Sequence, residues 1–256
     1  MRLEPGLSAI VTGAASGLGA ATARALAARG LRVAVLDRDA GRGAGVADEI
    51  GGTFCEADVA DPASVAAALD AAAAAHGPAR VAVSCAGIGP AARTVDREGR
   101  AHDPELFART LAVNLIGTFN LASQAAAAMV ALDPVTPDGE RGVIVTTASV
   151  AAIEGQIGQI AYAASKGGVA AMTLPMARDL AKSGIRVVAI APGLFRTPML
   201  AGLPQEAQDS LGAQVPFPAR LGDPSEFAGL VAQIVENPML NGTLIRLDGA
   251  IRMAPR

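Results

Sequence analysis

The chain has 256 residues, of which 51% are hydrophobic, and its formal net charge at pH 7 is −3. This length suits one α/β domain with a large core and argues against two domains. The charged residues are scattered along the sequence, which excludes the clustered basic surface of proteins that bind nucleic acid or anionic membranes.

Apolar runs typical of strands alternate with longer alanine-rich helical runs from end to end. This alternation predicts a single domain over residues 1–256 of the α/β class: a Rossmann-type, doubly wound, seven-stranded parallel sheet with helices on both faces. Ligands bind such a sheet outside the carboxyl ends of its strands. We expect strands at 7–11, 31–36, 53–56, 80–84, 142–147, 185–190 and 243–247, and helices at 17–29, 40–50, 62–75, 104–132, 159–182 and 224–236.

Three further segments bear on surface loops and on the location of the protein. The polar inserts at 93–103 and 133–141 predict surface loops. Residues 1–6 lack the apolar core of a signal peptide, and polar residues or proline interrupt each alanine-rich run before it reaches membrane-spanning length. We therefore expect a cytoplasmic protein without a membrane partner.

A glycine-rich turn joins the first expected strand to the first expected helix. It reads Thr12-Gly13-Ala14-Ala15-Ser16-Gly17-Leu18-Gly19. A turn of this kind presents backbone N–H groups and the positive helix end to a dinucleotide pyrophosphate. Its G-x-x-x-G-x-G spacing has three residues between the first two glycines, where the general nucleotide fingerprint has one. It resembles the short-chain dehydrogenase/reductase superfamily, although a plain tight turn has the same composition.

The second expected strand ends at Asp37, eighteen positions after Gly19. A carboxylate at this point accepts hydrogen bonds from the adenosine ribose hydroxyls and repels a 2′-phosphate, which favours NAD over NADP. A solvated loop aspartate is the alternative, and the neighbouring Arg38 would soften the repulsion.

Two further strand ends carry short motifs. Asp58-Val59 follows the third expected strand and resembles the superfamily's adenine-edging pair, and Cys85-Ala86-Gly87 follows the fourth and resembles its N-A-G motif with Cys in place of Asn. Cys55 and Cys85 lack C-x-x-C spacing, so we expect buried free thiols and no metal site.

The single tyrosine of the chain lies in Tyr162-Ala163-Ala164-Ser165-Lys166. On a helix, residues 162 and 166 project from the same face, so an ammonium lies beside a phenol. A neighbouring cation favours phenolate, and we expect it to lower the tyrosine pKa so that Tyr162 exchanges a proton with an alcohol or carbonyl. Taken singly, such a pair is also typical of an amphipathic helix face.

Two polar residues complete the pattern. Ser149 ends the fifth expected strand, thirteen residues before Tyr162, and its hydroxyl is placed to hydrogen-bond the same substrate oxygen. Asn114 interrupts an apolar helix, where a relay through its carbonyl and water to Lys166 would explain it. A strand-end cap and a satisfied buried amide are the alternatives for these two.

After the sixth expected strand, Ala191-Pro192-Gly193-Leu194-Phe195-Arg196-Thr197 resembles the superfamily's P-G motif and its following Thr, which meet the nicotinamide carboxamide. Residues 200–218 occupy the place of the superfamily's mobile substrate lid.

Longer stretches resemble one family within this superfamily, the type II 3-hydroxyacyl-CoA dehydrogenases, also called 17β-hydroxysteroid dehydrogenase type 10. They include Ser84-Cys85-Ala86-Gly87-Ile88, Gln214-Val215-Pro216-Phe217-Pro218 and 246–253. The resemblance covers essentially the whole chain, and Cys is the family's usual residue at position 85.

The resemblance implies reversible oxidation of a (3S)-hydroxyacyl-CoA to a 3-oxoacyl-CoA with NAD in fatty acid β-oxidation or a related pathway, by a homotetramer. It also implies the site residues. Catalytic residues are Asn114, Ser149, Tyr162 and Lys166. Cofactor contacts are Gly13, Ser16, Gly17, Leu18, Gly19, Asp37, Asp58, Val59, Cys85, Ala86, Gly87, Tyr162, Lys166, Pro192, Gly193, Phe195 and Thr197. Substrate contacts are Ser149, Gln156, Gln159 and Tyr162, with an ordinary polar loop as the alternative for Gln156 and Gln159.

Two other functions stay open at this point. One is a different oxidoreductase of the superfamily, either an alcohol or hydroxysteroid dehydrogenase or a 3-oxoacyl carrier-protein reductase; Asp37 argues against the NADP that the carrier-protein reductases usually take. The other is a non-catalytic NAD-binding sensor, because a fold does not determine a function. The full set of Ser149, Tyr162 and Lys166 argues against the sensor.

Overall fold

A computed structural model describes residues 1–202 and 204–255 of the chain. Its seven described strands form one sheet in the order β3-β2-β1-β4-β5-β6-β7, and every neighbouring pair is parallel. The strands are β1 (Ser8–Thr12), β2 (Arg32–Asp37), β3 (Thr53–Glu56), β4 (Val81–Ser84), β5 (Gly142–Thr147), β6 (Ile185–Pro192) and β7 (Leu244–Leu247). The predicted doubly wound sheet is confirmed.

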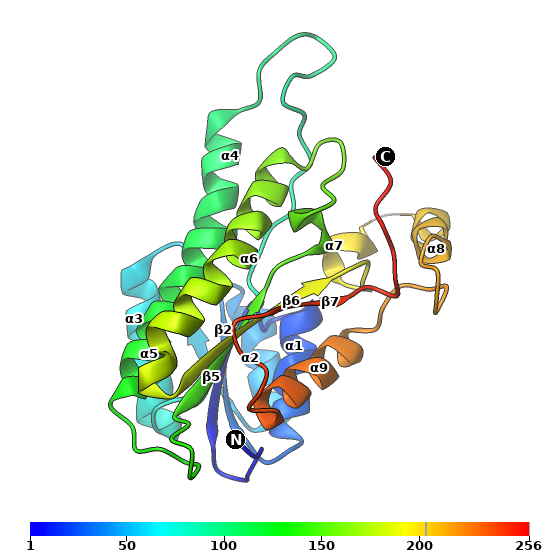
Figure 1. Cartoon of the computed structure of the whole chain (residues 1–256). Coiled ribbons are helices and arrows are strands. Elements are labelled where there is room, and N and C mark those ends of the chain that lie inside the picture. Colours follow the sequence, from blue (N-terminus) through cyan, green and yellow to red (C-terminus); the bar gives the residue numbers. More distant parts are fainter. Residues whose placement is uncertain (203, 256) are drawn as a thin grey trace.

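Helices cover both faces of this sheet, as Figure 1 shows. On one face lie α1 (Gly17–Ala27), α2 (Ala40–Ile50) and α9 (Pro224–Glu236). On the other lie α3 (Pro62–His76), α4 (Pro104–Leu111), α5 (Gly117–Val130) and α6 (Ile160–Leu180). The central strands are buried on both sides and therefore read as continuous apolar runs, which is why their positions were predictable to within one or two residues.

The structure corrects two details of the predicted helices. The helix expected at 104–132 is α4, then a π-helical turn at Ala112–Ile116, then α5. Two short helices, α7 (Pro198–Ala201) and α8 (Gln205–Ala213), lie at the predicted lid, where no helix was expected. Leu203, within that predicted lid, lies outside the described residues.

The helical stretch Pro104–Val130 is long and apolar enough to cross a membrane by length and composition, contrary to the expectation that no run reaches that length. Half of its most apolar window is buried in the fold. Its inner face packs Leu121, Ala125 and Met129 against the sheet. This burial identifies the stretch as a core helix.

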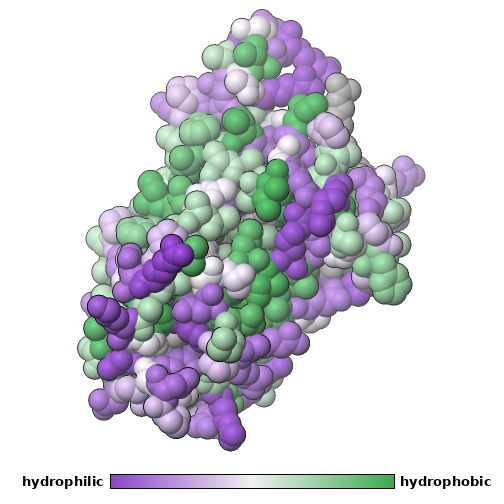
Figure 2. Space-filling view, viewed as in Figure 1, coloured by the Kyte–Doolittle hydropathy of each residue, from purple (hydrophilic) through white to green (hydrophobic). Residues whose placement is uncertain are grey.

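The outer face of the same helical layer is partly apolar. Ile116, Phe119 and Val130, on and next to α5, and Ile160 and Leu174 on α6 are exposed. Figure 2 shows apolar surface over the region where α4 and α6 lie in Figure 1. A single copy of the chain leaves these side chains in water.

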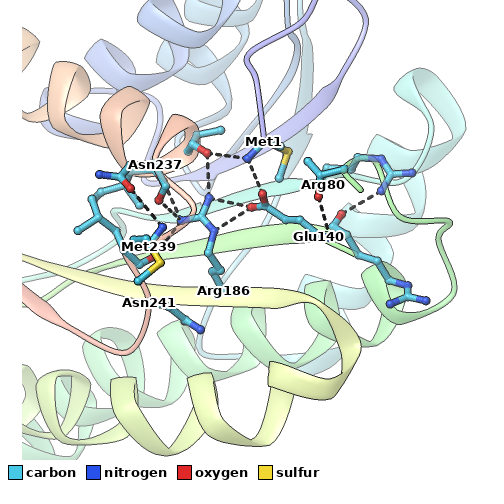
Figure 3. A network of polar contacts seen from close by, with 12 residues as sticks. Met1, Arg80, Glu140, Arg186, Asn237, Met239 and Asn241 are labelled. Carbon is cyan, nitrogen blue, oxygen red and sulfur yellow. Dashed lines mark hydrogen bonds and ion pairs between the residues drawn. The ribbon is translucent and has the colours of Figure 1, made fainter. Parts of the chain in front are cut away.

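A buried polar network fastens α9 to the sheet at the end opposite the strand carboxyl ends (Figure 3). Arg186, at the start of β6, pairs with Glu140 at 2.8 Å. Its guanidinium also donates hydrogen bonds to the main-chain oxygens of residues 234, 235, 237 and 240, at and just after the end of α9. The amine of Met1 contacts Glu140 and the Val235 carbonyl. The helix terminus is therefore capped by a buried cation.

Candidate active site

A cavity of about 790 Å³ opens at the carboxyl ends of the strands. The glycine turn after β1, the ends of β2 to β6 and the start of α6 line it. Of the residues predicted from the sequence, only Asn114 is absent from its lining. The others that line it are Gly13, Ser16, Gly17, Leu18, Gly19, Asp37, Asp58, Val59, Cys85, Ala86, Gly87, Ser149, Gln156, Gln159, Tyr162, Lys166, Pro192, Gly193, Phe195 and Thr197.

The glycine turn accepts no side chain at its two closest approaches. A Cβ on Gly13 would lie 2.6 Å from the Ala86 nitrogen, and one on Gly19 would lie 2.3 Å from the Gly13 oxygen. Gly13 also has a φ of +64°, which side chains disfavour. Ser16, the residue before α1, makes no side-chain capping bond, so the N–H groups of the first turn face the cavity. The turn therefore fits a phosphate group.

Asp37 is fixed beside this turn by backbone donors. Its Oδ2 accepts a hydrogen bond from the Ala15 N–H at 3.0 Å, and its Oδ1 accepts one from the Asp39 N–H at 3.0 Å. The Arg38 guanidinium lies 3.6 Å from Asp58, and both side chains are about half exposed. The cleft thus presents an anchored carboxylate where a ribose would lie, with the charge of Arg38 directed to Asp58.

Tyr162 and Lys166 project from one face of the first turns of α6, as predicted. The Lys166 Nζ lies 5.8 Å from the centre of the Tyr162 ring and donates a hydrogen bond to the Thr147 carbonyl at 2.7 Å. Burial lowers the pKa of Lys166 to about 8. The ammonium is therefore held under the phenol by the end of β5.

The pKa of Tyr162 is shifted in the direction opposite to the one expected from the sequence. Burial raises the pKa of Tyr162 above its ordinary value, and a hydrogen bond with Ser149 lowers it by less. We expected Lys166 to lower this pKa, but removal of the phenol from water disfavours the phenolate and sets the direction of the shift. The phenol is the stable form near neutrality.

Ser149 follows β5 and opens the short 3₁₀ turn Val150–Ala152, where its Oγ accepts a hydrogen bond from the Ala151 N–H at 3.1 Å. Ser149 therefore does cap the end of the strand, the alternative role considered for it from the sequence. Ser149 also contacts Tyr162 and lines the cavity, so the capping contact leaves it at the reacting end of the cleft.

Asn114 lies behind the cleft, fully buried at the π-helical turn. Its side chain exchanges hydrogen bonds with both backbone groups of Ile88 and donates to the Ser165 Oγ at 3.0 Å. Ser165 in turn donates to the Tyr162 carbonyl. Where a relay through the Asn114 carbonyl to Lys166 was expected, that carbonyl accepts from Thr118. Asn114 thus joins the loop after β4 to α6.

The remaining cleft residues have structural partners of their own. Burial raises the pKa of the Cys85 thiol to about 11, so it is neutral near pH 7, and both cysteines are free. Phe195 is buried against Gly222, where a Cβ would lie 2.7 Å from its ring. Gln156 donates its side-chain amide to the Ala254 carbonyl, and Gln159 accepts the Gln156 N–H. These amides reach the cavity while already bonded within the protein.

Other lining residues were not singled out from the sequence: Leu200 and Leu211, within the predicted lid, and Met253 near the C-terminus. Met253 belongs to the 246–253 stretch whose family resemblance was noted, but nothing local in the sequence directs it to the cleft. All three come from segments that reach the site only through the tertiary fold.

The chain is similar to known proteins in both sequence and structure. The family model described as short chain dehydrogenase matches residues 8–208. A 3-hydroxyacyl-CoA dehydrogenase type-2 from Homo sapiens is 53% identical over 257 residues, covering 99% of this chain and 98% of the relative, and the rat (Rattus norvegicus) protein of the same name is 52% identical over 258 residues, covering 100% and 98%. The crystal structure of 3-hydroxyacyl-CoA dehydrogenase type-2 from Mycobacterium avium has a TM-score of 0.94 and 45% identity, with all of both chains covered. The chain belongs to the short-chain dehydrogenase family and is an oxidoreductase.

Proposed function

We propose that this protein catalyses the reversible NAD-dependent oxidation of (3S)-hydroxyacyl-CoA to 3-oxoacyl-CoA. The observation that carries the proposal is one continuous cleft that joins the glycine turn and Asp37 to Ser149, Tyr162 and Lys166. More than half of the residues are identical to those of relatives named for this class of substrate.

NAD fits the polar groups of the cleft. The glycine turn would hold the pyrophosphate, Asp37 the adenosine ribose, and the Pro192-Gly193 turn with Thr197 the carboxamide. When bound, NAD supplies the hydride acceptor for the alcohol carbon. Asp37 would disfavour NADP because its carboxylate lies where a 2′-phosphate would be held.

The chain's own residues then handle the proton and the oxygen. Tyr162 takes the proton of the 3-hydroxyl in oxidation and returns it to the carbonyl oxygen in reduction. Ser149 hydrogen-bonds that oxygen and stabilises its developing charge. The Lys166 ammonium lies under the ring and favours the phenolate when the proton leaves. Asn114 holds the loop after β4 against α6.

We further propose that the protein is a cytoplasmic homotetramer. The exposed apolar side chains of α5 and α6 support self-association. Single exposed apolar residues are usual on the surface of a monomer, whereas several on one face are not. Sedimentation equilibrium of the purified chain tests the oligomeric state, and a monomer at micromolar concentration contradicts it.

The first experiment measures the decrease in NADH absorbance with acetoacetyl-CoA. Parallel assays use NADPH as the cofactor, and a ketosteroid, a simple ketone or an acetoacetyl carrier-protein thioester as the substrate. We expect rapid turnover with NADH and acetoacetyl-CoA. Turnover of only a steroid or simple ketone would move the substrate to another dehydrogenase class. NADPH preference with a carrier-protein thioester would favour a reductase, and tight NADH binding without turnover would favour a sensor. Chiral analysis of the 3-hydroxyacyl product tests the (3S) assignment.

A further inference from the structure

The C-terminal segment turns back over the cleft. After β7, the N–H of Ile251 bonds to the Asp248 carbonyl, and Ala250 has a φ of +68°, a left-handed value uncommon for a residue with a side chain. This reversal carries residues 251–255, the C-terminal tail, toward the loop 153–159 that precedes Tyr162. Figure 1 shows the red end of the chain rising beside that green loop.

Glu154 joins the loop to the tail through hydrogen bonds. Its carboxylate accepts hydrogen bonds from the Arg246 guanidinium at 2.9 and 3.2 Å and from the Met253 N–H at 3.1 Å. Arg252 approaches it at 3.4 Å. Only 19% of the Glu154 side chain and 22% of the Arg246 side chain are exposed, so this bidentate pair is better shielded than an ordinary surface pair.

The tail then bonds to the loop at two more positions. The Gln156 side-chain amide donates to the Ala254 carbonyl at 2.9 Å, and the Ile157 N–H donates to the Pro255 carbonyl at 3.0 Å. Arg246 also donates to the Ile251 carbonyl at 3.0 Å, which fixes the start of the tail. Loop and tail therefore form one bonded unit with Glu154 at its centre.

The loop lines two hollows of the surface. One is the active-site cavity, which Gln156 and Gln159 of the loop and Met253 of the tail line. The other is an open hollow of about 430 Å³, which Gln156, Ile157 and Gln159 of the loop line. The position of the loop and tail thus limits the space beside the catalytic tyrosine.

We propose that Glu154 is a positioning residue that holds the C-terminal tail in place, so that Met253 forms a wall of the acyl site and sets the length of acyl chain accepted. This inference rests on the proposed function for its substrate class. The Met253 side chain is unbranched and apolar, so it lines the site without needing a hydrogen-bond partner. Arg246 and the tail amides act through Glu154, at a distance from the reacting atoms.

The test is a double-mutant cycle of Glu154→Gln and Met253→Ala, with Glu49→Gln as the matched control. Glu49 also pairs with an arginine but is exposed and distant from the cleft. For each variant, kcat and KM are measured with acetoacetyl-CoA and with 3-oxodecanoyl-CoA, and hydrogen exchange is followed in loop 153–159 and the tail.

We expect each of the two variants to raise the ratio of kcat/KM for the long over the short substrate by about tenfold, the scale set by small changes of pocket size. The double variant should match Met253→Ala alone, because Glu154 acts through that side chain. Glu154→Gln should also speed exchange at Ile157 and Met253, while Glu49→Gln changes neither readout.

Two outcomes overturn the proposal. One is unchanged hydrogen exchange in Glu154→Gln, whatever substrate the protein takes. The other is an active wild type whose selectivity ratio is unaltered in Met253→Ala, a variant that keeps the carboxylate and its partners. Absence of acyl-CoA turnover by the wild type instead overturns the proposed function, so the two failures are distinguishable.

Discussion

The carboxylate of Asp37 accepts a hydrogen bond from the backbone N–H of Ala15, so the end of β2 is joined directly to the glycine turn that follows β1. This bond fixes the Asp37 carboxylate, the charge that we propose selects NAD over NADP, at the edge of the glycine turn. A carboxylate held by backbone donors keeps its place whether or not a ligand is present, and such pre-organisation favours binding.

Replacing Asp37 with Asn should reverse much of the cofactor preference. We expect kcat/KM for NADH to fall about ten- to a hundredfold, since a hydrogen bond to a charged group contributes about 1.5–3 kcal/mol. Loss of the negative charge should raise kcat/KM for NADPH. Steady-state kinetics with both cofactors measures this, and Asp39→Asn is the control because the Asp39 side chain caps α2. Equal losses with NADH and NADPH would show that Asp37 does not discriminate between them.

Removing the Tyr162 hydroxyl should separate binding from chemistry. In Tyr162→Phe the ring remains but no proton donor reaches the substrate oxygen, so we expect kcat to fall about 10²- to 10⁴-fold. NADH affinity, measured by fluorescence titration, should change little. Substantial remaining turnover would remove Tyr162 from the proton-transfer role.

The pH dependence of reduction should report Lys166. Its pKa is lowered to about 8 by burial, so the ammonium is present below that pH and lost above it, while the raised pKa of Tyr162 keeps the phenol protonated through the same range. We therefore expect kcat/KM for reduction to fall as pH rises through about 8. Oxidation requires the phenolate and should accelerate as pH rises. In Lys166→Arg, which stays cationic, the fall near pH 8 should vanish from the residual activity. If the fall persists, another group titrates there.

The positions of the strands and most of the cleft lining were predictable because their signals are local. Buried parallel strands are apolar throughout, and the glycine turn, Ser149, Tyr162 and Lys166 lie in short motifs. The π-helical turn was missed, since Ala112–Ile116 has the composition of any helix. The direction of the pKa shift of Tyr162 depends on how deeply the side chain is buried, and a sequence motif does not reveal burial. Glu154 and Arg246 are 92 residues apart, so their pairing has no local signal.

Removing the Asn114 amide should loosen the catalytic helix while leaving the cofactor turn intact. In Asn114→Ala the Ile88 N–H and carbonyl lose their buried partner, at a cost of about 1–3 kcal/mol in the free energy of unfolding. Because Ser165 loses its donor and Tyr162 a brace, we expect kcat to fall more than KM for NADH changes. A variant with normal kcat but reduced stability would restrict Asn114 to a structural role. Thr110→Ala offers a comparison, since Thr110 is also fully buried but bonds within α4.

The buried charge network at the far end of the sheet should govern stability without affecting catalysis. Arg186→Met leaves Glu140 buried beside the Met1 amine and removes the donors to the carbonyls at the end of α9. Breaking a buried pair on one side costs about 3–5 kcal/mol. Here Glu140 keeps only the Met1 amine as its cationic partner, and four main-chain oxygens at the end of α9 lose their donor. Urea unfolding should show this loss, and kcat at low temperature should be unchanged, since the network lies at the opposite end of the strands from the cleft. Arg24→Gln, which breaks the exposed pair with Glu49, should leave the unfolding midpoint almost unchanged. Similar midpoints for the two variants would mean that the buried network contributes no more than a surface pair.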